Sequence, residues 1–176
     1  MPSESGIRNG GIGADMAKKI CIYGLLSAVC MALSYLESLL PLDFIAPGVK
    51  LGLANSAALL LIYRGDPKGA AAVNLTRILL SALLFSGVSS LPFSLCGAAG
   101  AWAVSVLLGR CRQISVIGMS AAGGAVHNLL QGTVALAVIG RGVSVYFPVL
   151  LLLGTASGTL VGALCSAIIK KYKISE

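Results

Sequence analysis

The chain has 176 residues, of which 57% are hydrophobic and only 11% are charged. A soluble domain carries about 25% charged residues, so this composition excludes an ordinary soluble enzyme and predicts a protein that lies almost entirely in a lipid bilayer. At about 20 residues per membrane-spanning helix, the length allows about six spans with short loops and leaves no room for a soluble catalytic domain. The net charge of +7 would suggest nucleic-acid binding in a soluble protein. Here the basic residues stand at the ends of apolar segments, so they indicate membrane topology and no nucleic-acid partner.

Six apolar segments follow one another along the chain and are separated by short linkers. The predicted spans cover residues 20–40, 49–63, 68–85, 91–109, 116–139 and 146–169. We expect residues 18–172 to form a single six-helix membrane domain, with a Gly-rich, disordered tail at residues 1–17 and a short tail at residues 173–176. Among the linkers, residues 41–47 are long enough to act as a lid.

The basic residues assign the two sides of the membrane. Ten Lys and Arg residues fall at the two termini and in the even-numbered loops, whereas the opposite side carries two, Lys50 and Arg141. Cytoplasmic loops carry the excess of Lys and Arg, so both termini are predicted to be cytoplasmic, as an even number of spans requires. The predicted fold class is therefore an all-α integral membrane protein, a six-transmembrane-helix bundle that crosses the plasma membrane several times.

Several catalytic motifs are missing from the sequence. It has no Gly-x-x-x-x-Gly-Lys-Ser/Thr phosphate loop, no Asp-rich pair to hold magnesium on a prenyl diphosphate and, with six acidic residues in all, no Ser-His-Asp set. The one histidine and five cysteines show no metal-ligand spacing, so we expect no metal site and interpret the cysteines as small hydrophobic residues. The sequence therefore predicts a substrate-binding subunit of something larger that is not an enzyme and carries no cofactor.

Polar side chains interrupt the apolar segments near the middle of the membrane. They are Asn55 in the second segment, Asn74 and Arg77 in the third, and His127, Asn128 and Gln131 in the fifth. At 1.5 Å per residue, Arg77 lies roughly 13 Å and His127 roughly 16 Å from the cytoplasmic ends of their helices, in a hydrocarbon core of about 30 Å. Polar groups at this depth are costly unless they face a partner, a cavity or a substrate. We therefore expect these side chains to line one binding pocket.

Arg77 is the most informative of these residues. A central arginine costs about 2.5–3.5 kcal/mol even on the lenient insertion scale, and no carboxylate is expected at its depth, since Glu37 falls near a segment end. One interpretation is structural, with Arg77 capping backbone carbonyls or pairing with Glu37 across the bundle. The other is an anion site, in which Arg77 and Lys50 face a carboxylate, a phosphate or a polarised carbonyl.

The fifth segment carries the densest polar group. His127 and Gln131 are four residues apart and share one face of a helix, with Asn128 one position round from it. Taken alone, His127 is compatible with a hydrogen-bonded core histidine. Beside Asn128, Gln131, Asn55 and Arg77, it is better interpreted as part of the pocket lining, and a proton relay is the weaker alternative because no acidic partner is visible in that segment.

Small residues recur at four-residue spacing, which allows helix backbones to approach closely in lipid. In the sixth segment, Gly154, Gly158 and Gly162 are interpreted as internal packing positions. In the first segment, Ala28 and Ala32 show the same spacing.

Three stretches resemble one known family. They are Pro47-Gly-Val-Lys-Leu-Gly-Leu-Ala-Asn55, Asn74-Leu-Thr-Arg77-Ile-Leu-Leu-Ser81, and Gly124-Ala-Val-His-Asn128 with Gln131. They look like the Gx transporter family, which is also labelled heptaprenyl diphosphate synthase component I, and the resemblance runs from about Lys18 to Lys171. That family is similar to the S components of energy-coupling factor (ECF) transporters. Those are small six-helix membrane proteins that bind a vitamin or related nutrient from outside and dock on a module of one membrane T subunit and two cytoplasmic ATPases.

The resemblance implies a role for each group of residues. The pocket would be lined by residues 48–55 together with Asn74, Arg77, His127, Asn128 and Gln131. Ala28 and Ala32 match an Ala-x-x-x-Ala pattern that forms the docking face of S components. The ligand would be a small polar-headed or anionic nutrient, or an isoprenoid or quinone precursor, taken up at the expense of ATP hydrolysed by the module.

A second interpretation belongs to another class of protein. The chain could be a non-transporting membrane subunit or scaffold for heptaprenyl diphosphate or quinone metabolism, or for redox enzymes at the membrane. In that case Arg77 and His127 would hold a lipid headgroup or a quinone. The synthase label itself disagrees with the residues, because prenyl transfer needs acidic metal ligands that the chain lacks at a suitable depth.

Overall fold

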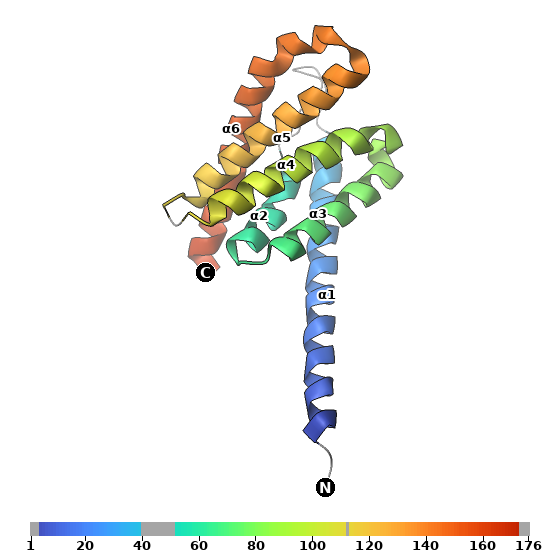
Figure 1. Cartoon of the computed structure of the whole chain (residues 1–176), viewed down its shortest axis with the longest axis vertical. Coiled ribbons are helices and arrows are strands. Elements are labelled where there is room, and N and C mark those ends of the chain that lie inside the picture. Colours follow the sequence, from blue (N-terminus) through green and yellow to red (C-terminus); the bar gives the residue numbers. More distant parts are fainter. Residues whose placement is uncertain (1–3, 40–51, 112, 173–176) are drawn as a thin grey trace.

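The computed structural model describes residues 4–39, 52–111 and 113–172, and all regular elements in these ranges are helical. The α-helices are α1 (Glu4–Ser38), α2 (Ser56–Tyr63), α3 (Pro67–Ser81), α4 (Leu91–Gly109), α5 (Val116–Ile139) and α6 (Phe147–Tyr172) (Figure 1). Short turns of other helix types join them: the 3-10 helices η2 (Leu53–Asn55), η4 (Val88–Ser90) and η5 (Arg141–Tyr146), and the π-helical turn η3 (Ala82–Ser86). The predicted all-helical class is confirmed for these ranges.

Five stretches are long and apolar enough to cross a membrane. They are Ala14–Ser38, Pro67–Ser86, Val88–Gly109, Val116–Ile139 and Arg141–Tyr172. The predicted second span is represented by the shorter apolar helix Leu53–Tyr63. A helix of this length is about 16 Å long, roughly half of the hydrocarbon core, so it does not span the bilayer alone. Five of the six predicted spans are therefore supported, and the cytoplasmic placement of both termini stays a prediction.

The N-terminal segment differs from its prediction. A disordered tail was predicted for residues 1–17, whereas α1 is continuous from Glu4. The chain has no proline between Pro2 and Pro41, so no residue in this stretch removes a backbone donor or blocks the helix. In Figure 1 the first half of α1 runs on beyond the other helices as a single rod.

Glycines bring α5 and α6 into backbone contact. A Cβ added to Gly124 would overlap the carbonyl oxygen of Gly154, and a Cβ on Gly158 would overlap the carbonyl oxygen of Ser120. At Gly162, an added Cβ would lie 2.7 Å from the Cα of Ile117. The prediction that the glycines of the sixth segment are internal packing positions is confirmed, and it agrees with the way small residues join helices in lipid.

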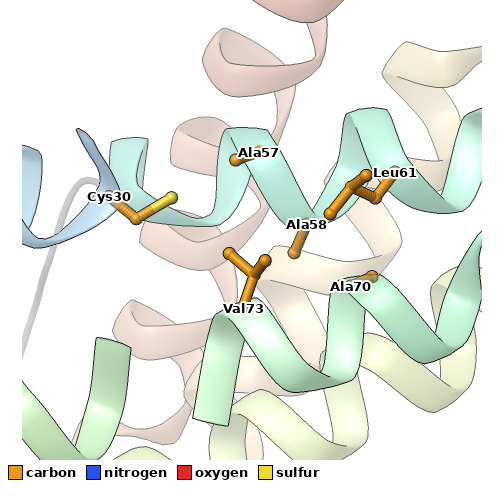
Figure 2. Close-up of a cluster of buried hydrophobic side chains, with 6 residues drawn as sticks. All are labelled: Cys30, Ala57, Ala58, Leu61, Ala70 and Val73. Atoms are coloured by element: carbon orange, nitrogen blue, oxygen red, sulfur yellow. The ribbon is translucent and has the colours of Figure 1, made fainter. Parts of the chain in front are cut away.

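The short helix α2 packs against α1 and α3 on one face and against α5 and α6 on another. Its Ala57, Ala58 and Leu61 pack with Cys30 of α1 and with Ala70 and Val73 of α3 in one cluster of buried side chains (Figure 2). On another face, Leu59 of α2 packs with Met119 of α5 and with Val161 and Cys165 of α6. Cys30 and Cys165 are thus buried among apolar side chains, as predicted for small hydrophobic residues.

Hydrogen bonds at the start of α3 fix it to α1 and α4. The carboxylate of Asp66 caps α3 by accepting from the N–H of Gly69 at 2.9 Å, and it also accepts from the hydroxyl of Tyr23 on α1. The hydrogen bond from Tyr23 is the main cause that lowers the pKa of the Asp66 carboxyl. On the other side, Trp102 of α4 donates from Nε1 to the carbonyl oxygen of Pro67 at 2.9 Å. These bonds hold α3, and with it Arg77, in a defined position between α1 and α4.

Candidate functional site

Six of the seven residues predicted to bind substrate line the same cavity. They are Asn55, Asn74, Arg77, His127, Asn128 and Gln131. The seventh, Lys50, lies outside the described residues, as do the predicted lid at 41–47 and residues 48–51 of the predicted pocket lining. The cavity walls come from every α-helix and from η2, so segments far apart in the sequence meet here. This cavity is called the central cavity below.

The central cavity is small. Its volume is about 80 Å³, and a single buried water needs roughly 10–15 Å³ on the same kind of measure. It therefore accommodates a small polar group or a few water molecules rather than a whole large ligand.

Arg77 stands among neutral oxygen atoms. Its Nε and Nη2 donate to Oδ1 of Asn74 at 3.1 and 2.7 Å, Nη1 donates to Oγ of Ser34 at 3.1 Å, and Nη2 donates to Oδ1 of Asn55 at 3.3 Å. The bonds orient the guanidinium from three elements, α1, η2 and α3. Because these acceptors carry no charge, they position the cation without neutralising it.

Glu37 corrects one expectation about the charges. No carboxylate was expected at the depth of Arg77, yet Glu37 is buried and lines the same cavity. Ser34 and Glu37 are three residues apart on one face of α1, so the helix that binds Arg77 through Ser34 also presents Glu37. The proposed pairing of Arg77 with Glu37 is supported in part. Their charges interact, but the hydrogen bonds described above for Arg77 go to neutral oxygens.

The carboxylate of Glu37 also organises η2. It accepts a hydrogen bond from the backbone N–H of Leu53, at the start of this 3-10 turn. The turn begins after Gly52, whose φ of 75° lies in the left-handed region that glycine adopts without strain. Glu37 and Gly52 together therefore place Asn55 where its side chain reaches Arg77.

His127 and Gln131 lie side by side on α5, as their spacing predicted, and both pack against Gly97 of α4. A Cβ added to Gly97 would lie 3.0 Å from Cε1 and Nε2 of His127 and 3.0 Å from Cγ of Gln131. Because Gly97 has no side chain, it leaves the space that the side chains of His127 and Gln131 need to reach the cavity.

Asn128 has a structural bond as well as a place on the cavity wall. Its Nδ2 donates to the carbonyl oxygen of Leu150 on α6 at 3.0 Å, and the residue is 4% exposed. The side-chain amide of Asn128 therefore links α5 to α6, a structural role that its predicted place in substrate binding does not include.

Sequence reasoning missed several lining residues. Besides Glu37, they are Trp102 and the serines Ser94, Ser105, Ser120 and Ser157. Serine is common in membrane helices, so a single serine gives no signal. A spacing argument could have found Ser120, which precedes His127 by seven residues and so lies on the same face of α5, two turns away.

The central cavity thus offers an oriented cation, one carboxylate, several hydroxyl groups, amides and an imidazole. Such a set suits a small anionic or strongly polar group. Within the described ranges, no group of three or more His, Cys, Asp or Glu residues could hold a metal ion.

Comparisons with known proteins place the chain in a family. Neither the curated proteins nor the solved structures gave a match. The heptaprenyl diphosphate synthase component I family does match, over residues 26–168, a range that contains every cavity residue named above. This match confirms the resemblance found in the sequence. The chain belongs to the heptaprenyl diphosphate synthase component I family.

Proposed function

We propose that the protein is the substrate-binding subunit of an energy-coupling factor type transporter in the plasma membrane, similar to an S component. It captures a small polar-headed or anionic molecule in the central cavity, and a module of one T subunit and two ATPases drives the uptake. The chain itself performs no chemical step, since its six acidic residues give it little with which to hold the metal of a prenyl diphosphate.

The observation that carries this proposal is the meeting of polar groups around Arg77. Polar side chains from five α-helices and η2 line one cavity in a bundle whose membrane-spanning helices are otherwise apolar. Burying so many polar groups within a membrane is costly, and a ligand that forms hydrogen bonds with them would explain their presence there. Arg77 donates its hydrogen bonds to uncharged oxygens, and the carboxylate of Glu37 offsets part of its positive charge from within the same cavity. The donors of Arg77 can therefore turn from these neutral acceptors to an anionic ligand.

The outer face of α1 supports docking on a module. Leu25, Ala28, Val29, Ala32 and Leu36 follow one another at helical spacing and are all exposed. A Cβ added to Gly24, one turn before Ala28, meets no other atom within 4 Å. Two alanines in the middle of this face would let the backbone of a partner helix approach closely.

Co-purification with the module tests the proposal. The tagged chain is expressed with the T subunit and ATPases of its host, as wild type, as the Ala28→Trp/Ala32→Trp variant, and as a control with Trp at Ala156 and Ala163, which are exposed on α6. We expect wild type and control to retain the module and the α1 variant to lose it, with all three equally folded by size-exclusion chromatography. Failure of the wild type to bind the module would reject the proposal.

The name of the family favours a second candidate. A component of a heptaprenyl diphosphate synthase would hold a prenyl headgroup at Arg77 without transport. In that case the tagged chain would retain a prenyl synthase subunit instead of the ATPases.

A further inference from the structure

A second concave site lies between α3 and α4. Ala71, Leu75 and Ile78 of α3 and Leu95, Ala98 and Ala99 of α4 form its apolar wall, and its volume is about 230 Å³. We call it the α3–α4 groove. Seven residues separate Ala71 from Ile78, so the groove runs for about 10 Å, two helical turns, along α3.

The groove and the central cavity share two residues. Asn74 and Trp102 line both. Asn74 is also the residue that holds Arg77 through two hydrogen bonds. The apolar groove and the central cavity therefore adjoin each other at Asn74 and Trp102, next to Arg77.

The room in the groove follows from the residues that line it. Where α4 meets α5, glycines such as Gly97 and Gly100 bring the helices together, and a Cβ on Gly100 would overlap the side chain of Leu130. Where α3 meets α4, the small residues that line the groove are Ala71, Ala98 and Ala99, whose short side chains leave space between the two helices. Leu75 and Leu95 at the rim are 48% and 36% exposed, so the groove is open on the side that faces lipid.

The two sites differ in the size of the group that each can hold. The central cavity has room for a small head, about 80 Å³, and the groove is nearly three times larger. We propose that the ligand is an amphiphile whose carboxylate or phosphate head binds at Arg77 and whose hydrocarbon tail lies in the α3–α4 groove. The inference rests on the proposed function and names the substrate class of the same site.

Selectivity over ordinary lipid comes from the head. Lipid tails are as apolar as leucine, so the groove alone gives a tail from the bilayer little reason to enter. A free anionic head gains charge-assisted hydrogen bonds from Arg77. The groove then adds affinity for ligands that carry a tail relative to those that do not, because apolar surface leaves water on binding.

Trp102 is the one tryptophan of the chain and lines both sites, so its fluorescence reports occupancy directly. The protein is placed in phosphatidylcholine nanodiscs and titrated with octyl phosphate and with octanoate, each carrying bromine at the end of the tail as a contact quencher. We expect saturable quenching that unlabelled competitors reverse. Octyl phosphate should reverse it at a concentration at least about tenfold lower than methyl phosphate does. The burial of two methylene groups is enough to account for a tenfold difference in affinity. Brominated phosphatidylcholine serves as the control for ordinary lipid contact.

Two sets of variants separate head from tail. Ala71→Leu/Ala99→Leu fills the groove, and Ala163→Leu is the matched control on α6, outside both sites. The filled groove should weaken octyl phosphate about tenfold or more and leave methyl phosphate, measured by calorimetry, unchanged. Arg77→Gln should remove the saturable quenching, whereas Arg141→Gln, an exposed arginine outside the cavity, should preserve it.

The outcomes distinguish the inference from the proposed function. Equal displacement by methyl phosphate and octyl phosphate would overturn the binding of a tail in the α3–α4 groove and leave the anion site at Arg77 intact. Quenching that does not saturate and that matches brominated phosphatidylcholine would reduce the groove to a lipid contact and overturn the inference. If octyl phosphate, octanoate and methyl phosphate all fail to bind, the inference fails with the anion site, while co-purification with the transport module still decides the proposed function separately.

Discussion

The two sides of the central cavity are held together by different forces. On one side, α4, α5 and α6 approach through glycines, with Gly124, Gly154 and Gly158 in backbone contact. On the other side, α1, η2 and α3 are joined by side-chain hydrogen bonds that meet at Arg77 and Asp66. Apolar burial gives little drive to associate within lipid, so helices there use close packing or polar bonds. In this molecule glycine packing predominates on the α4–α6 side, where the bond from Asn128 to Leu150 adds to it, and side-chain hydrogen bonds are concentrated on the α1–α3 side.

The two sides of the cavity therefore have different roles. Close packing of glycines leaves no space to adjust, so the α4–α6 side is a fixed wall that presents His127 and Gln131. The polar bonds on the α1–α3 side involve the groups that a ligand would also use, so binding can exchange one set of hydrogen bonds for another. The side that recognises the ligand is then also the side that can respond to it.

The largest expected effect on ligand binding comes from removing the side chain of Arg77, where the hydrogen bonds of the α1–α3 side meet. Arg77→Ala should weaken binding of octyl phosphate at least about 100-fold, because both the charge and its oriented donors are lost. The variant should still fold, since the glycine contacts of α4–α6 are untouched. Calorimetric titration in nanodiscs measures the loss, with Arg141→Ala as the control. Unchanged binding in Arg77→Ala would remove the anion site.

The next effect comes from the packed side. Gly158→Ala places a Cβ against the carbonyl oxygen of Ser120 and should cost about 1–3 kcal/mol, the range of overpacked sites. Gly24→Ala is the matched control, because a Cβ there meets no atom within 4 Å, and it should be neutral or stabilise by up to about 1 kcal/mol. Thermal unfolding in detergent compares the two. Equal melting temperatures would contradict the fixed wall.

The smallest effect concerns the cap of α3. The hydrogen bond from Tyr23 lowers the pKa of the Asp66 carboxyl below its ordinary value of 3.8. A carboxyl whose pKa is lower in the folded state stabilises the protein above the unfolded pKa, and this contribution is lost as the pH falls through the folded pKa. The melting temperature of the wild type should therefore fall below about pH 4. Asp66→Asn keeps a good capping residue but has no charge to lose, so its melting temperature should fall less over the same range. Parallel curves for the two proteins would contradict this role of Asp66.

The elements with the clearest sequence signals were predicted best. The predicted fourth and fifth spans coincide with α4 (Leu91–Gly109) and α5 (Val116–Ile139). The start of α5 is marked by Ser115, whose side chain accepts from the N–H of Gly118 at 3.2 Å, and its end by Gly140, with φ of 109°. The second span was predicted less well, because a continuous apolar run reveals burial but does not reveal that the helix itself begins only at Ser56.

The sequence by itself determined that this is a helical membrane protein and which polar residues gather inside it. Polar groups are so costly in lipid that Asn55, Asn74, Arg77, His127 and Gln131 had to share an environment. Only the tertiary structure decided how they are used. It placed Glu37 beside the cation, gave the amide of Asn128 to α6, and opened a groove between α3 and α4. These features depend on contacts between helices, and alanines that line a groove look the same in sequence as alanines that close one.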